Sequence, residues 1–515
     1  MKSLATLPTH VPALQQLVLE QQHMIETLKE QLRLSIRRQF GARNEFVNVD
    51  QLGLFALTSN DDSALIEIDF GTAEVVSITT AADDNNNKLP AERKKAIRIL
   101  KDLPREIRII DIPDSEKMSS CCGGALHPMK EESAEHLEYI PATLKIIETR
   151  RKKYACSGCH GEIKRAKEDF PPLFPKGMAS PSLIAFLIVS KYADHLPLYR
   201  ISQMLKRMGI EIADSLMSEW LLKSSEFFDG LMKRMIVTVL AKGHVFTDDT
   251  VLPMQNKNPD RNTTIKSRLW VYAAYTESER QKPLVVYDFS VTRSQSAPVG
   301  FLNGYRGYLQ ADAFPGYDTL YRSGDVKEVA CWAHARRKFV EVTALMKTPG
   351  RAHKAIAFIT QLYAIERQIR QIKDHDKLVH RQSQSKNTLA QFKAWLDIEV
   401  NGVLPKSAMG NAIHYALKNW DALCRYTEHG FLEADNNFAE RCMRPVALGR
   451  KNYLFVGSER AGKAAAIYYS LIESCKLNQV NPLTYMTYLL SNARNKAMTL
   501  LMPHEFNQTN ITQIG

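Results

Sequence analysis

Three acidic residues, far apart in the sequence, have the residue types and settings of divalent-metal ligands. Asp248 and Asp312 each end an apolar run, and Glu440 lies in a later segment typical of a helix. Two Mg²⁺ or Mn²⁺ ions held by these carboxylates would activate a water or a 3′-hydroxyl for in-line phosphoryl displacement. We expect Asp248 to bridge the two ions. The trio therefore predicts a chain that cuts and joins DNA.

Other choices of ligand stay open at this point. The chain has 56 acidic residues, and solvated aspartates are common at the ends of strands. Asp249 is an alternative to Asp248, and Glu473 is an alternative to Glu440.

Basic residues follow Glu440, with Tyr453 and Phe455 beside them, and a second basic group opens a helix near 335–339. Arginine and lysine neutralise phosphates, and aromatic rings stack on unpaired bases. A solvated basic face is the alternative interpretation. The predicted DNA contacts are Arg336, Arg337, Lys338, Arg441, Arg444, Arg450 and Lys451.

The aspartates need a sheet to position them. Apolar runs predict strands at 244–248, 268–275, 283–289, 308–312 and 328–332, with a short helix at 297–303 before the fourth strand. Three strands, a helix and a fourth strand describe the start of a ribonuclease H-like sheet. Residues 350–425 read as helices inserted before the chain returns to the core. Glu440 would project from a helix opened by Asp435, Asn436 and Asn437, which favour N-cap positions.

The first 240 residues have a different character. Apolar or near-apolar positions at heptad spacing within 13–38, including Gln21 and Ile25, predict a helix that pairs two subunits. Residues 47–95 read as a polar linker, and 107–170 carry cysteine pairs and strand-like pieces such as Thr143–Glu148. Ser180, Pro181 and Ser182 predict the start of a helix that continues over 183–192. Further helices predicted at 198–208 and from Ser215 allow a helix-turn-helix.

The bulk numbers fit a nucleic-acid-binding protein of several domains. Of 515 residues, Lys and Arg account for 68 and Asp and Glu for 56, giving a net charge of +12. We expect no signal peptide, no membrane span and no disulfide framework. These features predict a protein of the cytosol, which is a reducing compartment.

Several short motifs then match a known family together and in order. They are Arg37–Gly41, Leu103–Glu106, Lys191–Arg200, Cys331–Phe339, Asp435–Asn437 with Glu440 and Arg441, and Leu448–Asn452. The chain resembles DDE transposases of the insertion-sequence 66 family over roughly residues 30–500. The resemblance carries the catalytic triad onto Asp248, Asp312 and Glu440.

The resemblance implies a multidomain α+β protein with a ribonuclease H-like catalytic core and a helical insertion. A coiled-coil helix, a zinc-finger-like β module and a helical DNA-binding region would precede the core. The expected segments are a zipper (10–46), linker (47–100), zinc-finger-like module (101–170), DNA-binding region (171–240), first core part (241–345), insertion (346–430), second core part (431–500) and tail (501–515).

The sequence departs from the family pattern at two places. The first aspartate is followed by Asp249 instead of glutamate, which keeps a carboxylate. The first cysteine pair is the adjacent Cys121–Cys122 instead of a Cys-x-x-Cys pair, whereas Cys156 and Cys159 keep that spacing. We expect Zn²⁺ at Cys122, Cys156 and Cys159, with Cys121, His127 or His160 as the fourth ligand. A metal-free fold is the alternative.

Cys331 and His334 suggest a second metal site or Cys-His nucleophilic catalysis, but a lone histidine on a helix is more often structural or a phosphate contact. The resemblance implies strand cleavage and strand transfer at the terminal inverted repeats of an insertion sequence. Expected partners are element and target DNA, a second copy in a homodimer or larger synaptic complex, and accessory proteins encoded beside it. A catalytically inactive DNA-binding protein and a nuclease that cuts without joining are the alternatives.

Overall fold

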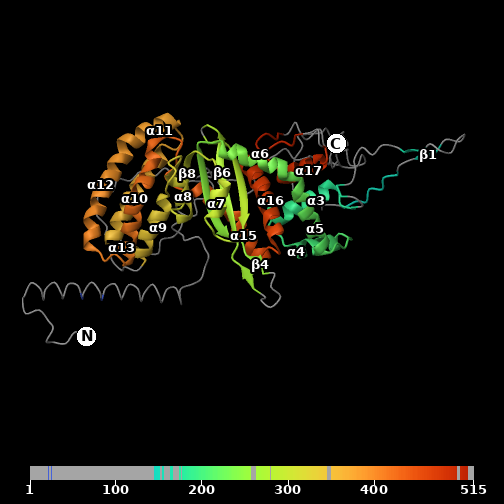
Figure 1. Ribbon diagram of the computed structural model, residues 1–515, viewed down its shortest axis with the longest axis horizontal. Coiled ribbons are helices and arrows are strands. Elements are labelled where there is room, and N and C mark those ends of the chain that lie inside the picture. The colour runs from blue at the N-terminus through green and yellow to red at the C-terminus, as the bar shows by residue number, and fades with distance from the viewer. Residues whose placement is uncertain are drawn as a thin grey trace, which may run out of the picture. The chain divides into compact units, whose positions relative to one another are not determined.

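The computed structural model describes residues 177–507, apart from 257–262, 279, 345–349 and 496–498 (Figure 1). It also describes residues 21, 25, 144–150, 153–155, 163–165 and 173–174. The fold is a mixed α/β arrangement of helices around one mixed sheet. No helix in these stretches is long and apolar enough to cross a membrane.

The central sheet has five strands in the order β7-β6-β3-β8-β9. β3 pairs antiparallel with β6 and parallel with β8, β6 pairs antiparallel with β7, and β8 pairs parallel with β9. The strands are rich in valine and aromatic residues, which suits a buried pleated surface. Their bounds are β3 His244–Val251, β6 Arg268–Glu277, β7 Gln281–Ser290, β8 Gly307–Gln310 and β9 Val326–Val329.

Each of the five predicted strands has a counterpart in this sheet, and the predicted helix at 297–303 is α7 Ser296–Phe301. The predicted bounds differ from the observed ones at several ends: β9, for example, ends at Val329 and not at 332. Two of these differences concern the aspartates. β3 continues past Asp248 to Val251, because residues 248–251 pair with β6. β8 ends at Gln310, so Asp312 lies two residues beyond it.

One hydrophobic core joins the sheet to the helices of residues 181–240 and 437–492. The first of these helices begins where predicted: Ser180 Oγ accepts a hydrogen bond from Leu183 N at 3.2 Å, and Pro181 occupies the first turn. The helices are α3 Pro181–Tyr192, α4 Leu198–Arg207, α5 Asp214–Ser225, α6 Asp229–Leu240, α15 Asn437–Tyr453, α16 Glu459–Leu477 and α17 Pro482–Asn492.

Helix α16 lies along the free edge of β7. The hydroxyl of Ser470 accepts a hydrogen bond from Tyr287 N at 2.8 Å, and that of Ser474 accepts one from Val285 N at 3.0 Å. Asn478 Nδ2 donates to the carbonyl of Pro283 at 2.7 Å. Backbone groups of an edge strand, which would otherwise lack partners in a buried place, are thus bonded by helix side chains.

A second hydrophobic core lies among the helices on the other side of the sheet (Figure 1), where Trp332 and Phe392 are fully buried. These helices fill the stretch predicted as an insertion, whose boundaries remain a prediction. They are α9 Trp332–Thr343, α10 Arg351–Gln368, α11 Asp374–His380, the π-helix η5 Arg381–Ser385, α12 Lys386–Glu399, α13 Ala408–Lys418 and α14 Trp420–Cys424.

The remaining elements are short. Two small antiparallel hairpins pair β1 with β2 and β4 with β5. The bounds are β1 Lys153–Ala155, β2 Ile163–Arg165, β4 Met254–Gln255, β5 Thr264–Ile265, α8 Asp318–Tyr321, and the single 3-10 turns η3 Glu226–Phe228, η4 Pro315–Tyr317, η6 Val400–Gly402 and η7 Arg425–Glu428.

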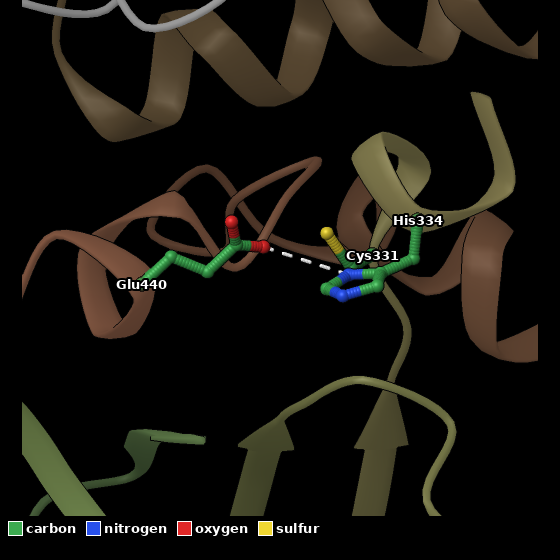
Figure 2. Close-up of side chains that lie close together, drawn as sticks. All are labelled: Cys331, His334 and Glu440. Carbon is green, nitrogen blue, oxygen red and sulfur yellow. Dashed lines mark ion pairs between the residues drawn. The ribbon is translucent and has the colours of Figure 1, made fainter. Parts of the chain in front are cut away.

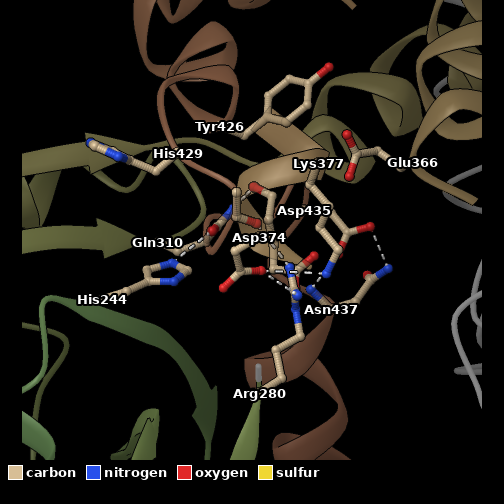
Figure 3. Close-up of polar contacts among 12 residues, drawn as sticks. His244, Arg280, Gln310, Glu366, Asp374, Lys377, Tyr426, His429, Asp435 and Asn437 are labelled. Carbon is tan, nitrogen blue, oxygen red and sulfur yellow. Dashed lines mark hydrogen bonds and ion pairs between the residues drawn. The ribbon is translucent and has the colours of Figure 1, made fainter. Parts of the chain in front are cut away.

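A polar network ties the second group of helices to the sheet (Figure 3). Arg280, in the turn between β6 and β7, forms ion pairs with Glu433 and, at 3.2 Å, with Asp374 of α11. Gln310 of β8 donates to the carbonyl of Glu433 at 2.8 Å and contacts His244 Nε2 at 3.0 Å. The segment that leads to α15 is therefore held from both sides.

Most of the N-terminal predictions lie outside the described residues. Within 13–38 only Gln21 and Ile25 are described, and both are helical. The strand suggested at Thr143–Glu148 was wrong for its described part: residues 144–150 belong to no strand, and Ile146 and Ile147 are exposed. Alternation of apolar residues gives a strand only where a neighbouring strand supplies hydrogen bonds, and none pairs with 144–150 among the described residues.

Candidate metal centre

The parallel pairing of β3 with β8 brings the two predicted aspartates together. Phe246 lies opposite Gln310 in the register of these strands. Asp248 and Asp312 are each two residues further along, so they occupy matching places on neighbouring parallel segments. The sheet therefore juxtaposes two residues that are 64 positions apart in the sequence.

Glu440 comes to the same place from the first turn of α15. Asn436, the residue before this helix, is fully buried, and its Nδ2 donates to the carbonyl of Thr247 at 2.8 Å. Of the three residues predicted to cap this helix, Asn436 makes no cap hydrogen bond because its amide bonds across to β3, whereas Asp435 Oδ1 accepts a hydrogen bond from Asn437 N at 3.0 Å. The bond from Asn436 to Thr247 fixes the start of α15 beside the first aspartate.

The three carboxylates are electrostatically coupled. Burial raises the pKa of Asp248 well above its ordinary value, and the charges of Glu440 and Asp312 raise it further. Burial raises the pKa of Asp312 to about 6, although Arg293 opposes the shift. Burial also raises the pKa of Glu440, against Arg337, Arg444 and Arg441. Like charges crowded in a poorly solvated site call for a cation.

The neighbouring Asp249 is engaged differently. Its carboxylate forms ion pairs with Arg293 at 2.8 Å and Arg268 at 2.9 Å, and its side chain is 1% exposed. Asp248 takes part in no ion pair within the described part of the chain. Of the two adjacent aspartates, Asp248 is thus the one left without a protein cation.

The alternative glutamate lies elsewhere. Glu473, on α16, is paired with Lys476 at 2.9 Å. Its charge raises the pKa of Tyr287 and Cys442 and is not among the causes of the shifts at Asp248 or Asp312. The structure therefore brings Glu440, and not Glu473, to the two aspartates.

Cys331 and His334, which the sequence had marked as a possible second metal site, lie beside Glu440 (Figure 2). His334 Nδ1 lies 3.5 Å from Glu440 Oε1, and Cys331 Sγ belongs to the same group of possible ligand atoms, all within 4.8 Å of one another. Burial lowers the pKa of His334 to about 4, with Arg337 and Lys338 adding to the shift, so the ring is neutral at pH 7. The three-residue spacing of Cys331 and His334 on one helical turn was the available signal.

The predicted DNA contacts have different surroundings. Arg337 lowers the pKa of both Asp312 and Glu440, which places it beside the carboxylates, and Arg336 is half-buried nearby on α9. Lys338 lies over the ring of Tyr415 at 5.7 Å. Arg450 is bound to the end of β3, donating to Thr250 Oγ1 at 2.9 Å and to the carbonyl of Val251 at 2.6 Å.

On α15, Arg441 and Arg444 both act to lower the pKa of Glu440. Lys451 is exposed near the end of the helix. Arg450 therefore supports the sheet, whereas the other predicted contacts lie near the carboxylates or on the surface.

The predicted zinc ligands Cys121, Cys122, Cys156 and Cys159, with the alternatives His127 and His160, lie outside the described residues. The hairpin of β1 and β2 brackets residues 156–162. The prediction of zinc at these residues therefore rests on sequence.

The comparison with known proteins decides the family. A family model described as the IS66 family transposase matches residues 176–464. The chain belongs to the IS66 transposase family. A model described as the zinc-finger binding domain of transposase IS66 matches residues 120–160, and one described as transposase C of IS166 homeodomain matches 27–108. The resemblance inferred from the motifs is thus confirmed.

Full-length relatives of this IS66 family chain occur in Sinorhizobium fredii. The uncharacterized protein y4jD is 32% identical over 508 residues, covering 96% of this chain and 95% of the relative. The uncharacterized protein y4qI is 31% identical over 500 residues, covering 94% of this chain and 89% of the relative. The similarity therefore includes both the described core and the N-terminal region.

Proposed function

We propose that this protein is a metal-dependent DNA transposase that cleaves the ends of its insertion sequence and joins them to target DNA. The observation that carries the proposal is the convergence of Asp248, Asp312 and Glu440, three partly buried carboxylates from separate elements, with Glu440 raising the pKa of both aspartates. Membership of the IS66 family supports it independently.

The strand order supports a ribonuclease H-like core. Numbered along the chain within the sheet, the order is 3-2-1-4-5, with strands 1 to 3 antiparallel and strands 4 and 5 parallel to the first. In this arrangement the first strand is central, and residues beyond the fourth lie next to it. Such a sheet offers a rigid base for a carboxylate site.

The residues present fit hard divalent ions. Carboxylate oxygens are the ligands that Mg²⁺ and Mn²⁺ prefer, and Glu440 Oε1 is buried with no hydrogen-bond partner among the described residues. Two bound ions would supply activation of the attacking oxygen and stabilisation of the leaving oxygen. Asp248, Asp312 and Glu440 would hold them, while Arg337 would orient the scissile phosphate beside the carboxylates.

The remaining parts of the proposal concern DNA recognition. Cys122, Cys156, Cys159 and Cys121 would hold Zn²⁺ in the matched zinc-finger segment, and the helices of 171–240 would read the terminal inverted repeats. The N-terminal helix would pair two copies in a synaptic complex, working on the nucleoid in the cytoplasm. Accessory proteins encoded beside the chain are further proposed partners.

The test is cleavage and joining of labelled element-end DNA with Mg²⁺ or Mn²⁺. Wild type should give both products, and Asp248→Asn, Asp312→Asn and Glu440→Gln should give neither while still binding the ends. Glu473→Gln, a matched buried glutamate, should remain active.

Other outcomes favour other functions. Binding without cutting, even with accessory proteins added, would favour a catalytically inactive DNA-binding protein. Cutting without joining would favour a nuclease. Activity in Glu440→Gln but not in Glu473→Gln would show that the third ligand is wrong.

A further inference from the structure

Cys331, His334 and Glu440 form a compact group, in which Oε1 of Glu440 is the carboxylate oxygen that faces His334 (Figure 2). Cys331 is the residue before α9 and His334 lies in the first turn of that helix, so their side chains share one face. Glu440 reaches them from α15. A thiol, an imidazole and a carboxylate together are a ligand set for zinc-like ions.

Two atoms of this group lack the partners that buried polar atoms normally have. His334 Nδ1 and Glu440 Oε1 are both buried, and neither has a hydrogen-bond partner in the described protein. They lie 3.5 Å apart without the alignment of a hydrogen bond. A cation between them would satisfy both.

The spacing suits a tetrahedral ion. Bond lengths of about 2.0–2.2 Å to nitrogen and oxygen place two such ligands roughly 3.3–3.5 Å apart, and the same geometry places sulfur roughly 3.6 Å from nitrogen. The observed nitrogen-to-oxygen distance is 3.5 Å, and the whole group fits within 4.8 Å. Closing around an ion would therefore need a shift of about 1 Å or less.

The group is also reachable from one side. The side chains of His334 and Glu440 are 21% and 14% exposed, whereas Cys331 is fully buried behind them. Cys331 Sγ accepts a hydrogen bond from Asn436 N at 3.2 Å, which fixes its position. An ion would thus enter past the imidazole and the carboxylate and meet the sulfur last.

We propose that Cys331, His334 and Glu440 bind a thiophilic divalent ion of the zinc class, at a site that shares Glu440 with the carboxylate site. Sulfur and imidazole ligands select zinc-like ions, whereas the aspartates select Mg²⁺. On binding, the Cys331 thiol forms the metal–sulfur bond and releases its proton to solvent. Bound zinc withdraws Glu440 from the aspartates, so it inhibits cleavage; this second part rests on the proposed function.

The binding test uses Co²⁺, whose bond to a thiolate gives an intense near-ultraviolet absorption band. The full chain is prepared with Cys121, Cys122, Cys156 and Cys159 changed to serine, which removes the other predicted thiolate site. We expect a thiolate band equivalent to one thiolate-bound Co²⁺ per chain, which Zn²⁺ displaces; Co²⁺ held by the carboxylates alone gives no such band. Cys331→Ala abolishes the band. Removing a residue that only hydrogen-bonds to a metal ligand lowers metal affinity roughly 10–100-fold. His334→Ala removes a ligand itself, so it should lower the affinity for Co²⁺ by at least this factor.

The matched control is Cys424→Ala, because Cys424 is another free thiol of the described part and belongs to no ligand group. This variant should keep the band. Absence of a band in the serine chain, or a band that survives Cys331→Ala, overturns the proposal. If the serine chain does not fold, the native chain answers instead: Cys331→Ala should bind one Co²⁺ fewer, and equal binding overturns the proposal.

A further variant separates this site from the proposed function. Asp248→Asn should lose cleavage and keep the cobalt band, so a missing band and a missing activity have different meanings. In the cleavage assay at fixed Mg²⁺, the Zn²⁺ concentration that halves the rate should rise roughly 10-fold or more in Cys331→Ala, relative to that variant's own zinc-free rate. An unchanged concentration would show that zinc acts elsewhere.

Discussion

Asn436 donates its side-chain amide to the backbone carbonyl of Thr247 at 2.8 Å. This bond joins the residue before Asp248 to the residue four places before Glu440, across 189 positions of sequence. The side chains of Asn436 and Thr247 are fully buried. A neutral hydrogen bond in the core thus helps to fix the position of the first aspartate relative to the glutamate.

We expect Asn436→Ala to lower the free energy of unfolding by about 1–3 kcal/mol, because the Thr247 carbonyl would lose its buried donor. Cleavage should fall more steeply than stability, since a small displacement of Glu440 disrupts the carboxylate geometry. Denaturant titration and the cleavage assay measure the two effects. Asn411→Ala, which removes an exposed amide, is the control. Equal effects of both variants would contradict the positioning role.

Asp312 makes the metal-free protein sensitive to pH. Its pKa in the folded protein is raised to about 6, above the ordinary value of about 4. A raised pKa contributes stability that is complete below about pH 4 and is lost as the pH rises through about 6. Asp312→Asn removes this dependence. Without metal, the variant should therefore exceed wild type by roughly 1–3 kcal/mol near pH 8, and the difference should shrink near pH 5.

Thermal melts with a chelator at several pH values measure this difference. Added Mg²⁺ should stabilise wild type more than Asp312→Asn, because only the charged site binds it well. A stability difference that does not change between pH 5 and pH 8 would refute the role given to this carboxyl.

Arg381 should be the most sensitive position of the second core. It is fully buried and forms two hydrogen bonds to Glu366, at 2.8 and 2.6 Å, together with bonds to the carbonyls of Tyr426 and His429. Arg381→Ala leaves a poorly solvated carboxylate unpaired and should cost about 3–5 kcal/mol. Lys393→Ala breaks an exposed pair with Asp397 and should cost under about 0.5 kcal/mol.

Chemical denaturation of both variants tests this contrast. Since Arg381 belongs to a π-helical turn beside the polar network of Figure 3, its loss should first expose amides of α11 and η5 to hydrogen exchange. Uniform exchange across the chain would argue against a local role.

Two helical glycines should respond in opposite directions to alanine. A Cβ on Gly462 of α16 would lie 2.5 Å from ring atoms of Phe289, so Gly462→Ala should destabilise by about 1–3 kcal/mol. A Cβ on Gly230 of α6 would meet nothing within 4 Å. Gly230→Ala should stabilise by about 0.4–1 kcal/mol through the entropy of the unfolded chain. Melting temperatures that shift in the same direction would contradict this packing.

The elements of the core could be predicted because their signals are local. Apolar runs such as Leu284–Tyr287 identify buried strands, and the sequence Ser180–Pro181 identifies a helix start. The strand ends were less predictable. β3 continues through Asp248 because β6 offers hydrogen-bond partners there, and a single strand's sequence carries no record of its neighbour.

The three carboxylates of the site could be proposed from the sequence, but the tertiary contacts around them could not. The family resemblance carries Asp248, Asp312 and Glu440, which stay predictions for catalysis although the structure brings them together. His334 and Cys331 were set aside because nothing in their segment reveals that α15 returns to them after about a hundred residues. Arg450 looked like a DNA contact because its bond to Val251 is a tertiary interaction.

The side-chain hydrogen bonds between α16 and β7 limit the insertions and deletions that these two elements can accept. Every fourth helix residue advances by roughly 6 Å, whereas every second strand residue advances by roughly 6.8 Å. The two repeats are therefore nearly equal in length. This near match lets three successive contacts form, from Ser470 to Tyr287, from Ser474 to Val285 and from Asn478 to Pro283. The mismatch reaches only about 1.6 Å over these contacts, but it grows with each further repeat. Such a helix can bond the edge of a sheet over a short length only. A single residue inserted in α16 or β7 would move the helix side chains away from the strand groups that they bond.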